Sequence, residues 1–178
     1  MKTVLIVLVI AVVGFLAFVV TRPDTYRVER SRRIDTPAGV IFAHLEDFKV
    51  WPAWSPWEKD PNAKKTFAGP ATGVGAGYSW EGNKDVGKGK ITVTRSTPPT
   101  LISYRLEFIE PFASIAAASF TLRPEGDQAV TVTWSLDGHN TFVGKVMSVF
   151  INMDRMIGGE FEKGLASLES ISEAEARK

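Results

Sequence analysis

Apolar residues dominate the N-terminal segment of the chain, and no charged residue interrupts them after Lys2. The run from Val4 to Val20 contains only apolar residues and glycine. At about 1.5 Å per residue, a helix over this run lies at the lower limit of what spans a hydrocarbon core of roughly 30 Å. We therefore expect residues 1–21 to form a transmembrane anchor. The positions expected within the membrane include Val4, Leu8, Val12, Leu16 and Val20.

A cleaved signal peptide is the alternative for this segment. An anchor is favoured because the run is long for the apolar core of a signal peptide, and no small-x-small cleavage pattern follows it between Ala17 and Pro23. Positive charge lies on both sides of the run, with Lys2 before it and several arginines from Arg22 to Arg33 after it. These charges favour a cytoplasmic domain in a single-pass protein of a bacterial inner membrane, although folded domains can be translocated despite such charge.

The pattern changes after Pro23, which ends the apolar helix. Residues 22–25 are expected to be a linker, and the domain is predicted over 26–172, followed by a polar tail at 173–178. Alternation from Tyr26 to Ile34 predicts a first strand. Thr36-Pro37 is typical of a helix start, with a capping hydroxyl and a proline in the first turn. A tryptophan- and proline-rich segment follows, which predicts a short helix or turn with a large aromatic content.

Period-two patterns separated by Gly, Pro, Asn or Asp predict the remaining strands. These strands are Lys64–Ala68, Gly77–Gly82, Lys88–Arg95, Leu101–Ile109, Ser114–Leu122 and Val130–Leu136. From Phe142 to Ile171 the apolar residues recur at three-and-four spacing, which predicts one long amphipathic helix with a kink near Gly158. The expected fold is α+β, with a curved antiparallel sheet of about seven strands wrapped around the C-terminal helix.

The alternation also predicts which side chains face the C-terminal helix. The candidates for this apolar wall are Tyr78, Trp80, Tyr104, Leu106, Phe108, Phe120 and Trp134 from the strands, Met147, Phe150 and Ile157 from the helix, and Trp57. The hydroxyl of Tyr104 and the indoles of Trp80 and Trp134 are possible hydrogen-bond donors to a ligand. The residues alone favour a solid core, because aromatic stripes on one sheet face usually pack together. Trp51, Trp54 and Trp57 are expected either to plug this core or to form an aromatic rim at the cavity mouth. The plug is favoured, with Trp57 as the exception.

Composition narrows the chemistry. The formal net charge of +1 gives no electrostatic case for nucleic acid, and the absence of cysteine excludes disulfides and thiolate chemistry. Neither His44 nor His139 has metal-ligand spacing, so we expect no metal, no cofactor and no assignable catalytic residue. Glu58, Asp85 and Asp137 are the carboxylates to consider for acid–base chemistry, although surface charge is the commoner role. We find no inward-facing ionisable side chain from the alternation.

Several separated motifs resemble the SRPBCC (START-like) superfamily, in its polyketide cyclase/dehydrase and lipid transport branch. The motifs are Ile34-Asp35-Thr36-Pro37, the segment Trp51–Trp57, Gly75-x-Gly77-Tyr78-x-Trp80, and Val132-x-Trp134-x-Leu136. This resemblance implies a helix-grip fold with a cavity under the long helix, and it favours a cavity over a solid core. Together with the anchor expected from the N-terminal run, it favours a membrane-held binder of a lipid or other apolar small molecule. A cyclase/dehydrase-like enzyme and a chaperone co-activator-like interaction module are the alternatives, and the oligomeric state is open.

Overall fold

A curved antiparallel sheet forms most of the domain in the computed structural model, which describes residues 1–177. Within these residues, seven strands pair in the order β1-β7-β6-β5-β4-β3-β2. The strands are β1 (Thr25–Ile34), β2 (Lys64–Ala68), β3 (Gly77–Glu81), β4 (Lys88–Thr97), β5 (Leu101–Glu110), β6 (Ser114–Pro124) and β7 (Val130–His139). From β2 to β7 each strand pairs with the next one along the chain, and β1 pairs with β7. The predicted meander is confirmed.

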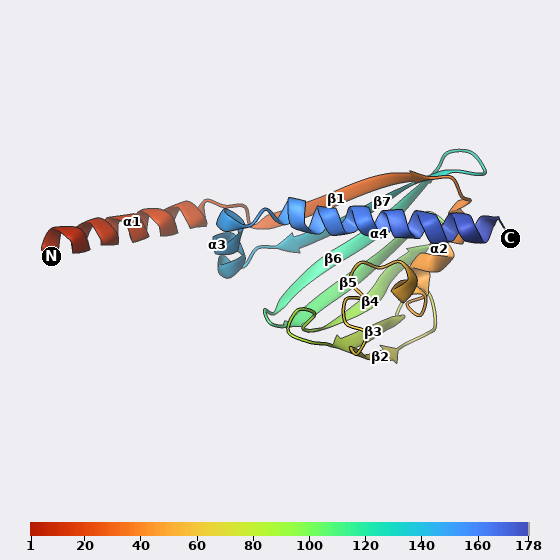
Figure 1. The fold of residues 1–178 in the computed structure, drawn as a ribbon, viewed down its shortest axis with the longest axis horizontal. Helices are drawn as coiled ribbons and strands as arrows, with labels where there is room; N and C mark the ends of the chain where they lie inside the picture. The colour runs from red at the N-terminus through yellow and green to blue at the C-terminus, as the bar shows by residue number, and fades with distance from the viewer. Residues whose placement is uncertain (178) are drawn as a thin grey trace.

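The helices occupy three different places (Figure 1). They are α1 (Lys2–Val20), α2 (Ala38–Glu46), the single-turn η1 (Trp51–Ala53), α3 (Phe142–Phe150) and α4 (Met153–Ala176). Helix α4 runs along one face of the sheet and packs against β1 and α2. Helix α1 projects away from the domain, and α3 lies beside its C-terminal end.

Helix α1 is long and apolar enough to cross a membrane, and only 6% of its most apolar 18-residue stretch is buried. Val19 is its only buried residue, and none of its residues belongs to the hydrophobic core cluster. The helix is therefore an appendage to the domain and adds nothing to its core.

The predicted C-terminal helix is divided into α3 and α4. The division falls at Ile151 and Asn152, and the side chain of Asn152 accepts a hydrogen bond from the backbone N–H of Arg155 at 2.9 Å. The break falls before Gly158, and α4 continues through that glycine and beyond the predicted domain end to Ala176. Periodicity missed the break because the apolar spacing runs on across it.

Helix α2 begins one residue later than its sequence suggests. Pro37 is the residue that precedes the helix, and no side chain caps its first turn. The hydroxyl of Thr36 is buried without a hydrogen-bond partner among the described residues, so the predicted capping role is wrong. Ile41, Phe42 and Leu45 bury the helix face that points to the sheet.

Candidate functional site

The inner face of the sheet, which α4 covers, is closed over part of its length by aromatic packing. The rings of Trp134 and Phe161 stack at 4.0 Å with an angle of 8°, and Phe120 stacks on Trp134 at 4.7 Å. Trp54 meets Trp134 edge-on at 5.8 Å. Contacts of this kind fill the space between sheet and helix, so this part of the predicted apolar wall is solid core.

An aromatic plug, made of Phe48, Trp51 and Trp54, closes this end of the grip. The indole N–H of Trp51 donates to the carbonyl of Leu45 at 3.1 Å, and that of Trp54 donates to the carbonyl of His44 at 3.2 Å. Both carbonyls belong to the last turn of α2, where the helix leaves its C=O groups without partners. The plug therefore stabilises α2 as well as filling the core, as the sequence predicted for two of its tryptophans.

Tyr104 also donates a hydrogen bond to the last turn of α2. Its hydroxyl hydrogen-bonds the carbonyl of Leu45 at 2.9 Å, and burial raises the pKa of Tyr104 well above its ordinary value. The indole N–H of Trp80 donates to the carbonyl of Val86 at 3.3 Å. These two donors, which the sequence suggested for a ligand, are thus engaged by the protein itself.

Three apolar side chains of the sheet and one at the start of α4 are less covered. We call Trp80, Leu106, Phe108 and Met153 the open end, because all four are half-buried and pack against the edge of the core. Trp80 and Phe108 meet edge-on, with ring centroids 6.0 Å apart and an interplanar angle of 77°. Gly89 lies between them in the sheet, and a Cβ there would come within 2.3 Å of the Trp80 ring, so only glycine lets the indole lie on the strand. The open end is an apolar and aromatic surface at the end of the grip.

The sheet register places the open end toward the end of the sheet at which β1 begins, just after α1. Phe108 pairs with Ser114, and the adjacent inner-face row joins Leu106, Ala116, Gly138 and Tyr26. Tyr26 is the second residue of β1, the strand that follows α1 and its linker. By this register, Leu106 and Phe108 lie toward the sheet end at which β1 begins, and α1 projects from that end of the domain (Figure 1).

A polar group borders this apolar surface. Lys65 on β2 forms an ion pair with Glu58, and both side chains are largely buried. The Lys65 ammonium lies 5.2 Å from the ring centroid of Tyr78, whose pKa is raised by burial and, to a lesser extent, by the Glu58 carboxylate. The expectation that no ionisable side chain faces inward is therefore wrong. Alternation on β2 places Lys65 on the same strand face as Phe67, and this apolar neighbour was the available sign that Lys65 faces inward.

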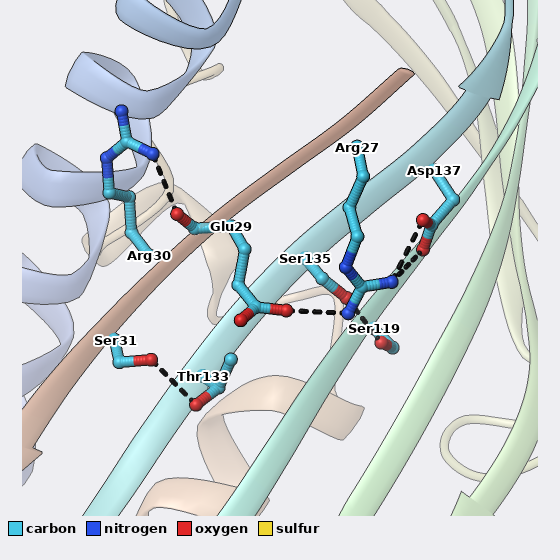
Figure 2. A network of polar contacts seen from close by, with 8 residues as sticks. All are labelled: Arg27, Glu29, Arg30, Ser31, Ser119, Thr133, Ser135 and Asp137. Carbon is cyan, nitrogen blue, oxygen red and sulfur yellow. Dashed lines mark hydrogen bonds and ion pairs between the residues drawn. The ribbon is translucent and has the colours of Figure 1, made fainter. Parts of the chain in front are cut away.

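Two arginines also face inward. Arg30 contacts Asp154 at 3.0 Å and Glu162 at 2.8 Å, and Arg32 contacts Glu169 at 2.5 Å. All three carboxylates belong to α4, so these pairs join β1 to the helix. Figure 2 shows the guanidinium of Arg30 on the helix side of β1, where it also donates to the backbone carbonyl of Glu29 at 2.7 Å. Alternation does not reveal them, because arginines occupy both faces of β1.

The outer face of the sheet carries a polar network (Figure 2). Arg27 binds both oxygens of Asp137 and also Glu29, while Ser31 contacts Thr133 and Ser119 contacts Ser135, each at 2.8 Å. A hollow of about 640 Å³ beside this network is bordered by Arg27, Arg105, Ile115 and Asp137, among others. Asp137, one of the carboxylates considered for acid–base chemistry, is thus neutralised on the outer surface.

The remaining predicted wall residues fall in different places. Ile157 is buried in the core, and Trp57 is 43% exposed, as expected for the exception in its cluster, with the Lys59 ammonium 5.3 Å from its ring. Met147 and Phe150 lie on α3 with exposed side chains, outside the core cluster. Phe150 borders a second hollow, of about 480 Å³, which Arg22, Tyr26, Ser148 and Met153 also help to form. Met153 therefore belongs to both this hollow and the open end.

Among residues 1–177, no group of three or more His, Asp or Glu side chains is arranged to hold a metal ion. The open end is an apolar surface, and Lys65, Glu58 and Tyr78 are the polar groups beside it.

Solved structures with this fold include enzymes and proteins without a stated role. Norcoclaurine synthase from Thalictrum flavum, solved with dopamine and hydroxybenzaldehyde, has a TM-score of 0.62 at 13% identity, covering 83% of this chain and 86% of its own. The Zhui aromatase/cyclase from Streptomyces sp. R1128 has a TM-score of 0.60 at 12% identity, covering 84% and 94%. A protein from Thermobifida fusca has a TM-score of 0.60 at 19% identity, covering 82% and 92%. These likenesses show the fold. No curated protein sequence matches the chain.

The sheet, the long C-terminal helix and the apolar inner face define a helix-grip protein of the ligand-binding type. Residues 25–173 match the family model described as polyketide cyclase / dehydrase and lipid transport. The chain belongs to this family, within the SRPBCC superfamily.

Proposed function

We propose that the protein binds a lipid or another apolar small molecule at the open end of its grip, while α1 anchors it in a membrane. The observation that carries the proposal is the position of the open end, whose half-buried apolar side chains lie at the sheet end that joins α1. A ligand drawn from the bilayer would therefore meet Phe108 and Trp80 first. The aromatic plug at the far end limits how deeply such a ligand can enter.

The chemistry of the open end suits an apolar ligand. Small-molecule sites are mostly apolar with a few polar groups that orient the ligand. Trp80, Leu106 and Phe108 supply the apolar surface, and Lys65 supplies a cation that could meet a carboxylate or phosphate head group. Met153 adds an adaptable side chain from α4.

The same polar group supports a second candidate, a cyclase-like enzyme. An enzyme of this kind needs an ionisable group beside the folded substrate to move protons. Lys65, Glu58 and Tyr78 are close together at the inner face. Because burial raises the pKa of Tyr78, its hydroxyl would act as a neutral hydrogen-bond donor at physiological pH. Loss of turnover with retained ligand binding in Tyr78→Phe would identify the enzyme.

Binding is tested with the full chain, purified in mild detergent and examined by native mass spectrometry and lipid extraction. Phe108→Ala is compared with Ile115→Ala, since Ile115 is exposed on the outer face. We expect Phe108→Ala to weaken binding of a fluorescent fatty acid about tenfold, which is about 1.4 kcal/mol of lost contact. Ile115→Ala should leave the Kd unchanged. A protein without bound ligand, or equal effects of the two variants, would contradict the proposal.

Membrane anchoring has its own test. We expect the full chain to remain in the membrane fraction after alkaline carbonate extraction, with its N-terminal segment intact by mass spectrometry. A mature chain that lacks α1 would show instead that this segment is a signal peptide.

A further inference from the structure

Helix α3 carries apolar side chains that the domain does not cover. Phe142, Val143, Met147 and Phe150 are all exposed, Phe150 by 73%, and no residue of α3 is buried. The helix contains no acidic residue, and Lys145 is its only charged one. An exposed apolar helix face of this kind on a folded protein is typical of a surface that contacts a membrane or another protein.

The position of α3 is fixed relative to the end of α1. The rings of Phe15 and Phe150 lie 6.1 Å apart. Lys145 forms an ion pair with Asp24 at 2.5 Å, and the amide of Asn140 donates to the carbonyl of Pro23 at 2.9 Å. These contacts hold the segment between α1 and β1 against α3, so the predicted linker is an ordered connection.

The contact between Phe15 and Phe150 gives the depth of α3. Phe15 precedes Val20, the last residue of α1, by five positions, which corresponds to about 7.5 Å along the helix axis. Amphipathic helices that lie in a membrane interface bury their apolar face by about 5–10 Å. If α1 spans a bilayer, Phe150 is therefore at the depth expected for such a helix.

We propose that α3 lies in the interface of the phospholipid bilayer, with Phe150 and Met147 inserted among the acyl chains. This inference rests on the proposed anchoring by α1. The polar contacts of α3 agree with it, because Lys145 and Ser148 face Asp24 and Arg22, at the point where the chain leaves α1. The domain is thus held on the membrane in one orientation. In that orientation, the hollow bordered by Arg22, Phe150 and Met153 lies at the head-group level.

The absence of cysteine allows a direct test with the full chain. Single cysteines are introduced as Phe150→Cys and Met147→Cys in α3, Val12→Cys in α1, and Thr121→Cys on the outer sheet face, all at exposed positions. Each is labelled with an environment-sensitive fluorophore and reconstituted in vesicles of phosphatidylcholine and phosphatidylglycerol. Quenching is measured with shallow and deep spin-labelled lipids and with aqueous iodide.

We expect the α3 labels to be quenched by the shallow lipid at least fivefold more strongly than the label at position 121. The label at position 12 should respond most to the deep lipid. If iodide quenches the α3 labels as strongly as the position 121 label while position 12 stays protected, α3 is outside the membrane and the anchor stands. If position 12 is also open to iodide, the anchoring itself is wrong, and the inference falls with it.

Discussion

Two adjacent glycines in α4 have different surroundings, and only one of them is required for packing. A Cβ at Gly158 would lie 2.1 Å from the guanidinium of Arg30, whereas a Cβ at Gly159 would meet nothing within 4 Å. Gly158 therefore lets Arg30 cross the helix to reach Asp154 and Glu162. The sequence suggested a kink at this point, but the glycine serves close approach between β1 and α4.

This difference predicts opposite results for the same substitution. Gly159→Ala should raise the free energy of unfolding by roughly 0.5–1 kcal/mol, because alanine loses less conformational freedom in a helix than glycine. Gly158→Ala has the same helical benefit but displaces Arg30, so we expect no gain or a net loss of stability. Urea unfolding followed by circular dichroism measures both. Equal stabilisation by the two variants would show that Arg30 moves aside at no cost.

The direction of a side chain in the site could be predicted only where the strand shows a clear period-two alternation of apolar and polar residues. Alternation identified Tyr104, Phe120 and Trp134 as inward-facing, and all three are buried. It could not show that the Tyr104 hydroxyl is bound to α2, because that contact joins segments distant in sequence. Lys65 was missed because β2 is short and mostly exposed, so its apolar face is weakly marked.

At the scale of elements, strands were easier to predict than helix ends. Turn residues delimit the strands, and β2 has the predicted bounds, Lys64–Ala68. The division between α3 and α4 depends on local capping by Asn152, which a three-and-four pattern does not detect. The two helices that result have different surroundings, since α4 buries one face in the core and α3 buries no residue.

Capping at the two helix starts should therefore have unequal effects on the domain. Asn152→Ala removes the side chain that accepts from Arg155, and we expect it to lower the free energy of unfolding by about 1 kcal/mol. Thr141→Ala removes the corresponding contact with Gly144 at the start of α3. Because α3 adds nothing to the core, its fraying should leave the urea midpoint nearly unchanged. A larger loss in Thr141→Ala would mean that α3 supports the domain.

Across the whole molecule, a net charge of +1 conceals a strong separation of charge. Arg30 and Arg32 of β1 face carboxylates of α4, and Lys59, in the loop that follows the plug, pairs with Glu160 of the same helix at 2.9 Å. The helix is thus held to the sheet by apolar packing on one side and by ion pairs along its edges. Composition could not reveal this arrangement, because it appears only when β1 and α4 are brought together.

These ion pairs predict that the domain loses stability in acid. Hydrogen bonds from Arg30 hold the pKa of Asp154 below its ordinary value of 3.8, and Lys163 and Lys59 hold that of Glu160 below 4.5. A carboxyl group with a depressed pKa in the folded state contributes stability above its unfolded pKa and loses it as pH falls through the folded pKa. We therefore expect the urea midpoint to be nearly constant from pH 7 to about pH 5 and to decrease below about pH 4.5.

Asp154→Asn provides the control for this pH dependence. The amide keeps the shape of the carboxyl group but cannot carry its charge, so the variant should be less stable than the unmodified protein at pH 7. As pH falls and Asp154 becomes protonated in the unmodified protein, the two urea midpoints should converge. Parallel curves would show that the pair with Arg30 contributes nothing to folding, as is found for many exposed ion pairs. In that case the stacking of Phe161 of α4 on Trp134 of β7 would contribute more to holding the helix on the sheet than this ion pair does.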